Sequence, residues 1–537
     1  MNTMKSFSKF LLLMWVAIVL VGCSFGTGKP ETLSVAPTTV PTFMPRADVT
    51  VEPRTSRPNF LIILVDDLDA KLSSMQYAPN IQELLTSQGI SIDNFLISTP
   101  VCCPSRSSIL CGQYAHNHRV YTNAAPLGGF EKFYALQNET STLATWLQAT
   151  GYHTALFGKY LNGYPLKNNR TYIPPGWEEW VSPGRGTPYK EFNYYLNENG
   201  NLVGYGLGTN EYMTDVLSQK ADDYLRGLAS DTKPFFIYLA PYAPHEPAVP
   251  APRHADLFSD LQVPRMPSFN EDDVSDKPGG IHDNPLLDAG KIINLDELYR
   301  QRIRSMQAVD EMVARLINTL KETGKLDNTF IIFMSDNGYH LGQHRLYAGK
   351  GTPYEEDIVV PFIMRGPGIP ANLEIKDFIA GNTDIAPTIA ELAGVIPPAF
   401  VDGRSLVPLW SADPPSLKDW RQGYLIEYYG SETTSGYEDQ LIGSGSVDQL
   451  REPPDPEQYT ESAPLAKFFA IRTIQYLYVE YPSGVRELYD LKQDPYEVNN
   501  IASAADPNLL SQFSTWLKEL VNCSGDSCLA IEQIGLH

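Results

Sequence analysis

The sequence is poor in cysteine and in basic residues. It has 6 cysteines in 537 residues, and neither a Cys-x-x-Cys pair nor a His-Glu-x-x-His string occurs, so the usual sequence signals of a zinc site are absent. Lysine and arginine number 41 against 63 aspartate and glutamate residues, and the formal charge is −22. This excess of acid argues against a broad nucleic-acid-binding surface, whereas a small anionic substrate needs only local positive charge.

The apolar run near the N-terminus, residues 10–22, is too short to span a bilayer and is typical of the hydrophobic region of a signal peptide. It follows Lys5 and Lys9 and ends in the string LVGC, which resembles the bacterial lipoprotein box. The resemblance implies that Cys23 is lipidated; the alternative is a plain secretory signal followed by a chance cysteine. We therefore expect an exported protein, lipid-anchored at the bacterial cell surface or at the periplasmic face of a membrane.

Four continuous apolar runs are each followed by polar residues. Such runs are typical of strands that are buried on both faces, as in a parallel sheet covered by helices. In open α/β sheets, ligands gather at the carboxyl ends of the strands, so we expect the four polar groups to meet at one edge. The runs are 60–65, 154–157, 235–240 and 330–334, and they lead to Asp66-Asp67, Gly158-Lys159, His245 and Asp336-Asn337, respectively.

Helices are predicted between these strands. Residues 79–88 are followed by Gly89, and residues 298–323, with one apolar face, are followed by Gly324. Alternating strands and helices predict one large α/β domain. Residues 23–57 are rich in threonine and proline, which predicts an extended tether. The predicted division is a signal peptide (1–22), the tether (23–57), a large α/β domain (58–405) and a smaller C-terminal domain (406–537).

The strand-end acids are candidate metal ligands. Asp66, Asp67 and Asp336 with the amide oxygen of Asn337 make an all-oxygen donor set, which suits Ca²⁺, or less well Mg²⁺. The alternative is that these residues only cap helices and turns, which is common at strand ends.

Residues 100–112 read PVCCPSRSSILCG, which resembles the sulfatase signature Cys-x-Pro-Ser-Arg. The signature falls on Cys102, Pro104, Ser105 and Arg106. Resemblance to this family, part of the alkaline-phosphatase superfamily, implies a large, mixed, mostly parallel sheet sandwiched by helices, with a smaller C-terminal α+β domain that carries an antiparallel sheet. It also implies that a formylglycine-generating enzyme oxidises Cys102 to formylglycine.

The chemistry explains why cysteine itself would not serve as the nucleophile. A thiolate that attacked sulfate would leave a stable S-sulfonate, whereas hydrated formylglycine has a second hydroxyl whose deprotonation expels sulfate. A metal ion would lower the pKa of this diol. A helix predicted to begin at Ser105 would add positive potential at the anion.

The resemblance also implies roles for individual residues. Metal ligation falls on the four strand-end residues named above together with the modified Cys102. Arg106 holds the formylglycine region, His245 contacts sulfate and protonates the leaving oxygen, and Asn162 is a further candidate for substrate binding. Lys159, in the Gly-Lys motif, and Lys350, in GKGTPYEE, are the sulfate-binding lysines.

The sequence departs from the family at one place. Many sulfatases read Gly-Lys-Trp-His, where the histidine helps as a base, but residues 158–162 read GKYLN. This form is similar to N-acetylglucosamine-6-sulfatases and extracellular heparan 6-O-endosulfatases, which share the strings at 116–118 (HNH) and 335–340 (SDNGYH). His118 is the first candidate for the missing base, and its alternative is a loop histidine that positions the backbone. His340 and His344 are weaker candidates.

The other cysteines and two polar stretches complete the predictions. Cys523 and Cys528 are close in sequence, which favours a small-loop disulfide in an exported protein. Cys103 is expected to be packed or bonded to Cys111. Residues 262–295 and 430–462 are predicted to be surface insertions.

The sequence thus predicts a formylglycine-dependent, Ca²⁺-binding sulfatase that removes 6-O-sulfate from glucosamine-type sulfated saccharides. The excess of acid favours action on chain ends or small fragments over action on long polyanions. One alternative is a phosphodiester or phosphonate monoester hydrolase of the same superfamily, and another is a non-catalytic glycan-binding lipoprotein. Contact with a membrane is expected only through the lipid on Cys23, and no contact with nucleic acid is expected.

Overall fold

The structure, a computed structural model, describes residues 57–430 and 466–536. The predicted signal peptide, the lipidation at Cys23, the tether up to residue 56 and the stretch 431–462 lie outside the described residues. Within the described ranges, no helix is both long enough and apolar enough to cross a bilayer.

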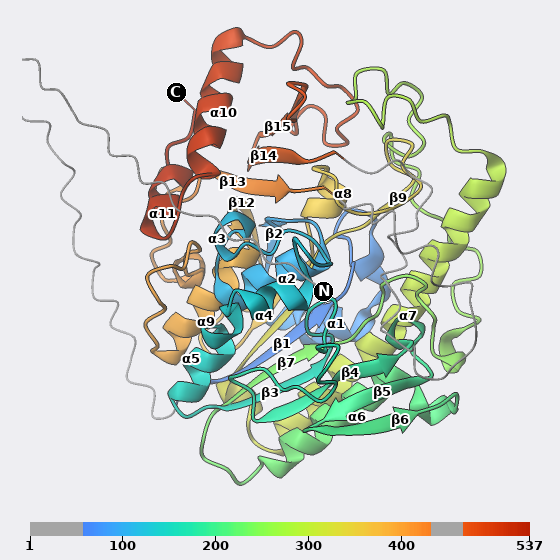
Figure 1. Cartoon of the computed structure of the whole chain (residues 1–537), viewed down its shortest axis with the longest axis vertical. Helices are drawn as coiled ribbons and strands as arrows, with labels where there is room; N and C mark the ends of the chain where they lie inside the picture. The colour runs from blue at the N-terminus through green and yellow to red at the C-terminus, as the bar shows by residue number, and fades with distance from the viewer. Residues whose placement is uncertain (1–56, 431–465, 537) are drawn as a thin grey trace, which may run out of the picture. The chain divides into compact units, whose positions relative to one another are not determined.

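A ten-stranded sheet forms the centre of the large domain (Figure 1). Its strand order is β12-β2-β11-β8-β1-β7-β3-β4-β5-β6, and β1 pairs in parallel with both β7 and β8. The predicted fold class is confirmed: the sheet is mostly parallel and helices cover it. The strands are β1 (Asn59–Val65), β2 (Ile90–Leu96), β3 (His153–Gly158), β4 (Glu179–Gly186), β5 (Tyr194–Glu198), β6 (Asn201–Tyr205), β7 (Phe235–Ala240), β8 (Thr329–Ser335), β11 (Phe362–Arg365) and β12 (Leu373–Gly381). The four predicted strands are thus present, with bounds that differ by no more than one residue.

The apolar run of β1 is buried on both of its faces because successive side chains point to opposite sides of a sheet. Phe60, Ile62 and Leu64 belong to one core cluster, with residues of α2 (Cys102–Cys111), α5 (Leu143–Ala149) and α9 (Ile385–Ala393). Leu61, Ile63 and Val65 belong to a second cluster, with residues of α6 (Met213–Gly227) and α7 (Ala289–Glu322). Two helical layers therefore explain the absence of polar alternation in this strand.

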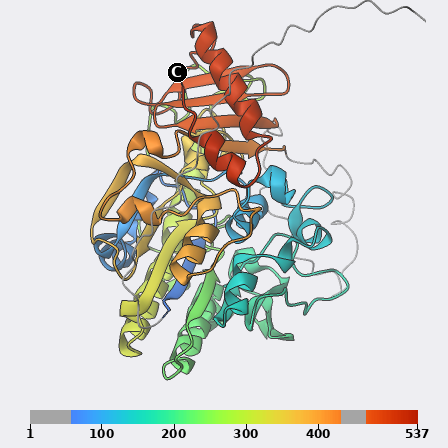
Figure 2. The same cartoon turned by 90° about the vertical axis from the view of Figure 1, so that its left-hand side faces the viewer.

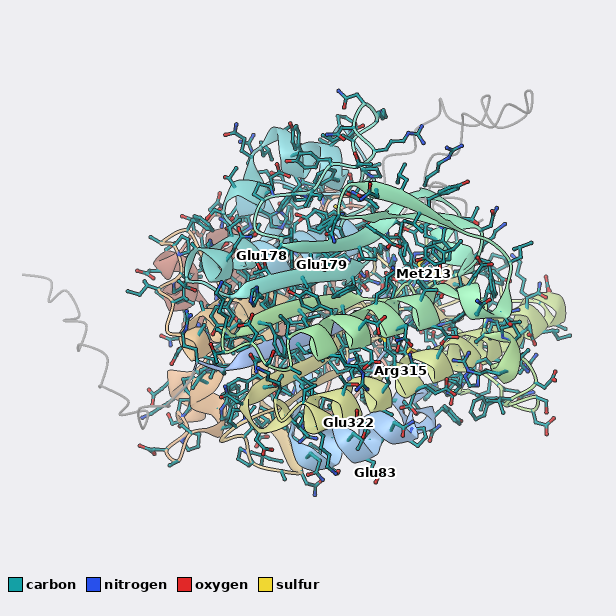
Figure 3. All side chains as sticks on the ribbon, turned by 90° about the horizontal axis from the view of Figure 1, so that it is seen from below. Glu83, Glu178, Glu179, Met213, Arg315 and Glu322 are labelled. Atoms are coloured by element: carbon teal, nitrogen blue, oxygen red, sulfur yellow. A yellow bond between two sulfur atoms is a disulfide. The ribbon has the colours of Figure 1, made fainter. Side chains whose placement is uncertain are left out.

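The helices on the second face differ from the prediction at their ends. Residues 79–88 form α1 (Pro79–Leu84) and then a 3-10 turn (Thr86–Gln88), where Thr86 and Ser87 are poor helix formers. Helix α7 begins at Ala289, and the carboxylate of Asp288 accepts the backbone N–H of Lys291 at 2.9 Å. Figure 3 shows α1, α7 and α6 next to one another, marked by Glu83, Arg315 with Glu322, and Met213.

The predicted surface insertion at 262–295 is only partly correct. Its last seven residues belong to the first two turns of α7. Val263, Glu271 and Lys277 within it are buried, at no more than 5% exposure. The stretch therefore contributes to the interior of the domain, and acidic composition alone was a poor guide to exposure.

The C-terminal part carries a separate four-stranded antiparallel sheet, as predicted (Figure 2). It consists of β13 (Gly423–Tyr428), β14 (Phe468–Thr473), β15 (Tyr476–Glu480) and β16 (Arg486–Asp490), with α10 (Pro507–Leu520) and α11 (Asp526–Glu532). The predicted disulfide between Cys523 and Cys528 is present and links the end of α10 to α11. The boundary at 405 stays a prediction; Leu406, Leu409 and Trp420 still pack in the core of the large sheet.

Several shorter elements lie between the longer ones along the chain. They are α3 (Ala115–His118), α4 (Gly129–Ala135), α8 (Glu355–Ile358) and the two-stranded pair β9 (His340–Leu341) and β10 (Ala348–Gly349). In this pair His340 lies opposite Gly349, next in the chain to Lys350.

Candidate active site

The carboxyl ends of four neighbouring strands deliver the site residues. β8, β1, β7 and β3 are adjacent and parallel, and each is followed by the polar residues that the sequence indicated. All of these side chains are buried: Asp66, Asp67, Asp336 and Asn337 are 0% exposed, and Lys159 and His245 are 1% and 2% exposed. The predicted meeting of these groups at one sheet edge is therefore present in the fold.

Asp66, Asp67, Cys102 and His245 form a group that could hold a metal ion, because one ligand atom of each lies within 4.8 Å of the others. Cys102 Sγ lies 3.3 Å from Asp66 Oδ1, and His245 Nε2 lies 3.5 Å from Asp67 Oδ2. Asp67 has a φ of +67°, a conformation that aspartate tolerates better than most residues. Asp66 and Asp67 were predicted as ligands, as was Cys102 in its modified form.

Asp336 and Asn337 lie beside this group, and their contacts differ. The two oxygens of Asp336 accept from the backbone N–H of Asp67 at 3.2 Å and from Arg106 Nε at 2.7 Å. Asn337 Nδ2 donates to Asp67 Oδ1 at 2.6 Å, which leaves Asn337 Oδ1 buried and without a hydrogen-bond partner within the described ranges. An orphaned amide oxygen beside carboxylates fits a hard, oxygen-binding cation such as Ca²⁺.

The grouping of His245 with the carboxylates was not predicted, since it was assigned to sulfate. Its Nδ1 donates to the backbone oxygen of Glu246 at 2.6 Å, so Nε2 is the atom that faces Asp67. The same atom can therefore serve either the cation or the substrate.

Cationic side chains balance the carboxylates of the site. Lys159 Nζ lies 2.5 Å from Asp66 Oδ2, and Lys350 Nζ lies 2.5 Å from Asp67 Oδ1 and 2.9 Å from Cys102 Sγ. Arg106 also donates to the backbone oxygen of Lys159 at 2.9 Å. The acidic protein thus contains a small buried region with three cations, as an anionic substrate requires.

Burial and these charges shift the pKa values of the site. Burial alone would raise the pKa of Asp66, but the charges of Lys159, His245 and Arg106 outweigh it and hold that pKa well below its usual range. Burial and the nearby Asp66 raise the pKa of Asp336 to about 6. Burial, with Asp66 next, raises the pKa of the Cys102 thiol well above its usual value, so the unmodified thiol stays protonated at neutral pH.

Two tyrosines that were not predicted line the site. Lys159 Nζ lies 5.1 Å from the ring centre of Tyr189 and 5.6 Å from that of Tyr242, and the rings of Tyr189 and His245 are 4.5 Å apart. Asn162 Nδ2 donates to the Tyr189 hydroxyl at 3.4 Å, while Asn162 Oδ1 is buried without a partner in the described part of the chain. Tyr242 follows β7 by two residues and could have been found from that position; Tyr189 lies in an edge turn with no such signal.

Cys102 is the first residue of α2, so this helix begins three residues before the predicted start at Ser105. Val101 is extended and accepts the N–H of Ser105 at 3.1 Å, and Pro104 lies in the first turn, where its missing N–H leaves no helical bond unmade. All ten residues of the helix are buried. The helix N-terminus therefore directs its positive potential at Cys102 itself.

The candidate bases have different surroundings. Val120 donates its N–H to His118 Nδ1 at 3.1 Å, and His118 Nε2 lies 3.1 Å from Ser108 Oγ. Burial lowers the pKa of His118 to about 3. Both ring nitrogens are thus engaged in a neutral ring, surroundings that favour the alternative, a histidine that positions the backbone.

His340 and His344 are each paired with a carboxylate. His340 Nδ1 lies 3.0 Å from Asp357 Oδ1, and His344 Nδ1 lies 2.8 Å from Glu271 Oε2. Of these two histidines, His340 is the one paired across the strands with a neighbour of Lys350, since it lies opposite Gly349.

The two other cysteines near the site are not bridged. Cys103 and Cys111 are both free and buried, and both belong to the core cluster of the large sheet. The pairing considered for them is therefore wrong, and the packed state expected for Cys103 is correct.

Comparisons with known proteins agree with this geometry. The family description "Sulfatase" matches residues 58–395. The arylsulfatase of Volvox carteri is 35% identical over 511 residues, which cover 88% of this chain and 76% of the relative. The N-acetylglucosamine-6-sulfatase of Homo sapiens is 33% identical over 485 residues, which cover 88% and 86%. The solved structure of BT4656 with its substrate D-glucosamine-2-N,6-O-disulfate shares the fold, at a TM-score of 0.68, 24% identity and coverage of 86% of this chain and 97% of that one. The chain therefore belongs to the sulfatase family and is a sulfuric ester hydrolase.

Proposed function

We propose that this protein removes 6-O-sulfate from glucosamine-type saccharides, using a formylglycine at position 102 and a bound Ca²⁺. The observation that supports it most is the position of Cys102. Its Sγ lies 3.3 Å from a carboxylate oxygen of Asp66 and 2.9 Å from Lys350 Nζ, at the N-terminus of a buried helix. A nucleophile at this atom would be next to both the cation ligands and a positive charge for sulfate.

The state of the thiol supports modification over direct attack. Since burial keeps Cys102 protonated at neutral pH, the cysteine itself would be a weak nucleophile. Formylglycine, when formed, supplies a hydrated aldehyde with one hydroxyl for attack and another for release of sulfate. Ca²⁺, when bound through Asp66, Asp67, Asp336 and Asn337, would supply charge stabilisation for the sulfate oxygens.

The remaining steps belong to side chains of the chain itself. Lys159 and Lys350 hold and neutralise the sulfate oxygens. The carboxylates with which they are now paired, Asp66 and Asp67, would bind the cation instead. His245, when protonated on both ring nitrogens, donates a proton from Nε2 to the leaving sugar oxygen, while Nδ1–H donates to the backbone oxygen of Glu246. Arg106 fixes Asp336 and, through the oxygen of Lys159, the strand end that carries that lysine.

The substrate class rests on the relatives and on the wall of the site. A relative at 33% identity is named N-acetylglucosamine-6-sulfatase, and a structure with the same fold holds D-glucosamine-2-N,6-O-disulfate. Tyr189 and Tyr242 are aromatic rings beside Lys159, and Asn162 Oδ1 offers an acceptor to a sugar hydroxyl. The formal charge of −22 favours chain ends or small fragments over long polyanions.

The location is part of the same proposal. The N-terminal string that ends at Cys23 supports export and lipid anchoring at the surface or the periplasmic face of a bacterial membrane. Maturation then requires a formylglycine-generating enzyme as a partner of the newly made chain.

Mass spectrometry of the peptide that contains Cys102 tests the covalent mechanism. Conversion of cysteine to formylglycine replaces the CH₂SH group by an aldehyde and lowers the mass by about 18 Da. Protein from a host with the maturation enzyme should show this shift at residue 102 and no shift at Cys103, which lies in the same peptide. An active preparation with only unmodified Cys102 would overturn the mechanism.

Parallel assays test the reaction and substrate. We expect the highest kcat/KM for glucosamine 6-sulfate and a lower value for a sulfated sugar with sulfate at another position. A much higher kcat/KM on an aryl phosphate diester or a phosphonate monoester would favour the alternative, a phosphodiester or phosphonate monoester hydrolase. Absence of turnover by protein that carries formylglycine would favour the glycan-binding alternative.

A further inference from the structure

A second group of buried ligands lies outside the site of Cys102. His344, Glu356 and Glu497 are 0%, 4% and 1% exposed, and one ligand atom of each lies within 4.8 Å of the other two. His344 follows β9, Glu356 is in α8, and Glu497 follows β16 of the C-terminal sheet. Two ligands from neighbouring segments and one from a distant part of the chain therefore converge on this point.

The orientation of His344 is fixed by a carboxylate. Its Nδ1 lies 2.8 Å from Glu271 Oε2, so Nδ1 carries the proton and donates it to this carboxylate. Nε2 is then an acceptor with a free lone pair. Histidines that bind metals commonly have this arrangement, in which a carboxylate holds the far ring nitrogen.

Each glutamate has one oxygen engaged. Glu497 Oε2 accepts the backbone N–H of Glu355 at 2.9 Å, and Glu356 Oε1 accepts from Ser268 Oγ at 3.4 Å. The other oxygens, Glu497 Oε1 and Glu356 Oε2, and also His344 Nε2, are buried with no hydrogen-bond partner among the described residues. Three acceptors thus share one small region without a donor from another described residue, which is costly unless a shared proton or a cation joins them.

The neighbouring charges do not fill this need. Glu355 is paired with Arg472 at 2.8 Å and with Lys71 at 2.9 Å, and Glu271 has Lys277 at 3.4 Å. Neither Glu356 nor Glu497 has a salt bridge to a described residue. The nearby cations thus form their ion pairs with Glu355 and Glu271 and not with Glu356 or Glu497.

We propose that His344, Glu356 and Glu497 bind a divalent cation of the zinc and manganese class, separate from the cation of the active site. One imidazole nitrogen and two carboxylate oxygens suit such a metal, with a fourth position for water, whereas a calcium site would be built from oxygen alone. The ligands are 12, 141 and 153 residues apart in sequence, so no short motif announces them.

The bound cation would join the C-terminal sheet to the segment that carries Lys350. Glu356 is followed by Asp357, whose Oδ2 accepts from the backbone N–H and hydroxyl of Thr352 at 2.9 and 2.6 Å. Thr352 lies two residues from Lys350. The role of this site is therefore structural: through Asp357 and Thr352 it fixes the position of the segment that carries Lys350.

Cobalt absorption and metal analysis of the full mature chain test the proposal. With millimolar Ca²⁺ present to fill the active site, we expect one equivalent of Co²⁺ to bind, with visible bands of a low-coordinate nitrogen and oxygen site and no thiolate charge-transfer band. Zn²⁺ should displace it. Binding should persist in Asp336→Asn and in the control His282→Gln, whose ring is exposed, and be lost in His344→Gln and Glu497→Gln.

Three results would overturn the proposal. They are the absence of any Co²⁺ or Zn²⁺ equivalent on the folded wild-type chain, a thiolate band that assigns the metal to Cys102, and retention of the metal by folded His344→Gln and Glu497→Gln. Circular dichroism checks the fold of each variant, and the wild-type titration decides where a variant does not fold. The sulfatase assays above are independent of this result.

Discussion

Asp336 has two partners at the floor of the active site, and one of them is a buried charge. Its Oδ2 accepts from Arg106 Nε at 2.7 Å, and both side chains are 0% exposed. Asp336→Ala should therefore abolish activity and also lower the free energy of unfolding by about 3–5 kcal/mol, because it removes the carboxylate to which Arg106 Nε donates and leaves the buried guanidinium with the longer 3.8 Å contact to Asp66 Oδ2. Urea denaturation of the cation-loaded protein measures the loss.

A milder variant separates the two roles of Asp336. Asp336→Asn keeps an oxygen for a hydrogen bond and should lose activity with a clearly smaller loss of stability. The exposed Asp413→Ala should change neither quantity. Equal stability of Asp336→Ala and wild type would show that Asp336 acts only as a metal-site residue.

At the scale of single residues, the sequence predicted side chains that directly follow a strand. Asp66, Lys159 and Asp336 were found in this way, because the position of a strand end fixes the position of the next residue. The role of His118 was not predictable, since it depends on hydrogen bonds to Ser108 and Val120 that only packing brings together. The same holds for Tyr189.

At the scale of elements, an ion pair between the half-buried His116 and the buried Glu427 joins α3 to β13 of the C-terminal sheet. Burial alone would lower the pKa of His116, but Glu427, with Nδ1 and Oε2 3.1 Å apart, outweighs it and raises that pKa to about 9. The raised pKa adds stability that is complete below the unfolded value near 6.5 and is lost as the pH rises through about 9.

His116→Gln should therefore reduce the free energy of unfolding by about 3 kcal/mol below about pH 6.5, and by progressively less up to about pH 9. Denaturation at a series of pH values measures this difference. The exposed His282→Gln is the control and should show no such trend. A difference that stays constant over this range would mean that the pair is not charged in the folded protein.

Strands were easier to predict than helix starts for a physical reason. A strand covered on both faces, such as β1, is an uninterrupted apolar run with sharp ends. The first turn of a helix needs no apolar residue and admits proline, so α2 begins before Pro104 and α7 begins nine residues before the predicted Leu298. Register and pairing of the strands could not be predicted from runs alone.

At the scale of the whole molecule, the net charge opposes the charge of the pocket. The chain carries −22 overall, whereas Lys159, Lys350 and Arg106 surround Cys102. For a long sulfated polymer, kcat/KM should rise about threefold to tenfold when ionic strength increases from about 0.02 to 0.2 M, because salt screens the repulsion outside the pocket.

A sulfated monosaccharide is the matched control in this experiment. It contacts only the pocket, where Lys159, Lys350 and the bound Ca²⁺ would meet the sulfate, so its kcat/KM should fall or stay constant over the same range of salt. A fall in kcat/KM for the polymer would contradict the prediction and would indicate an extended basic surface for the chain of the polymer.

The complete burial of α2 limits when Cys102 can react. All ten residues of the helix are buried, so a modifying enzyme that must bind this segment of the chain cannot do so in the folded protein, whereas a substrate needs access only to the reacting atom at the helix N-terminus. Whether residue 102 is cysteine or formylglycine is therefore set between synthesis and folding and does not change afterwards. The fraction of folded molecules that carry the modification therefore equals the fraction modified before folding. Activity of the unmodified molecules can be recovered only by unfolding them first.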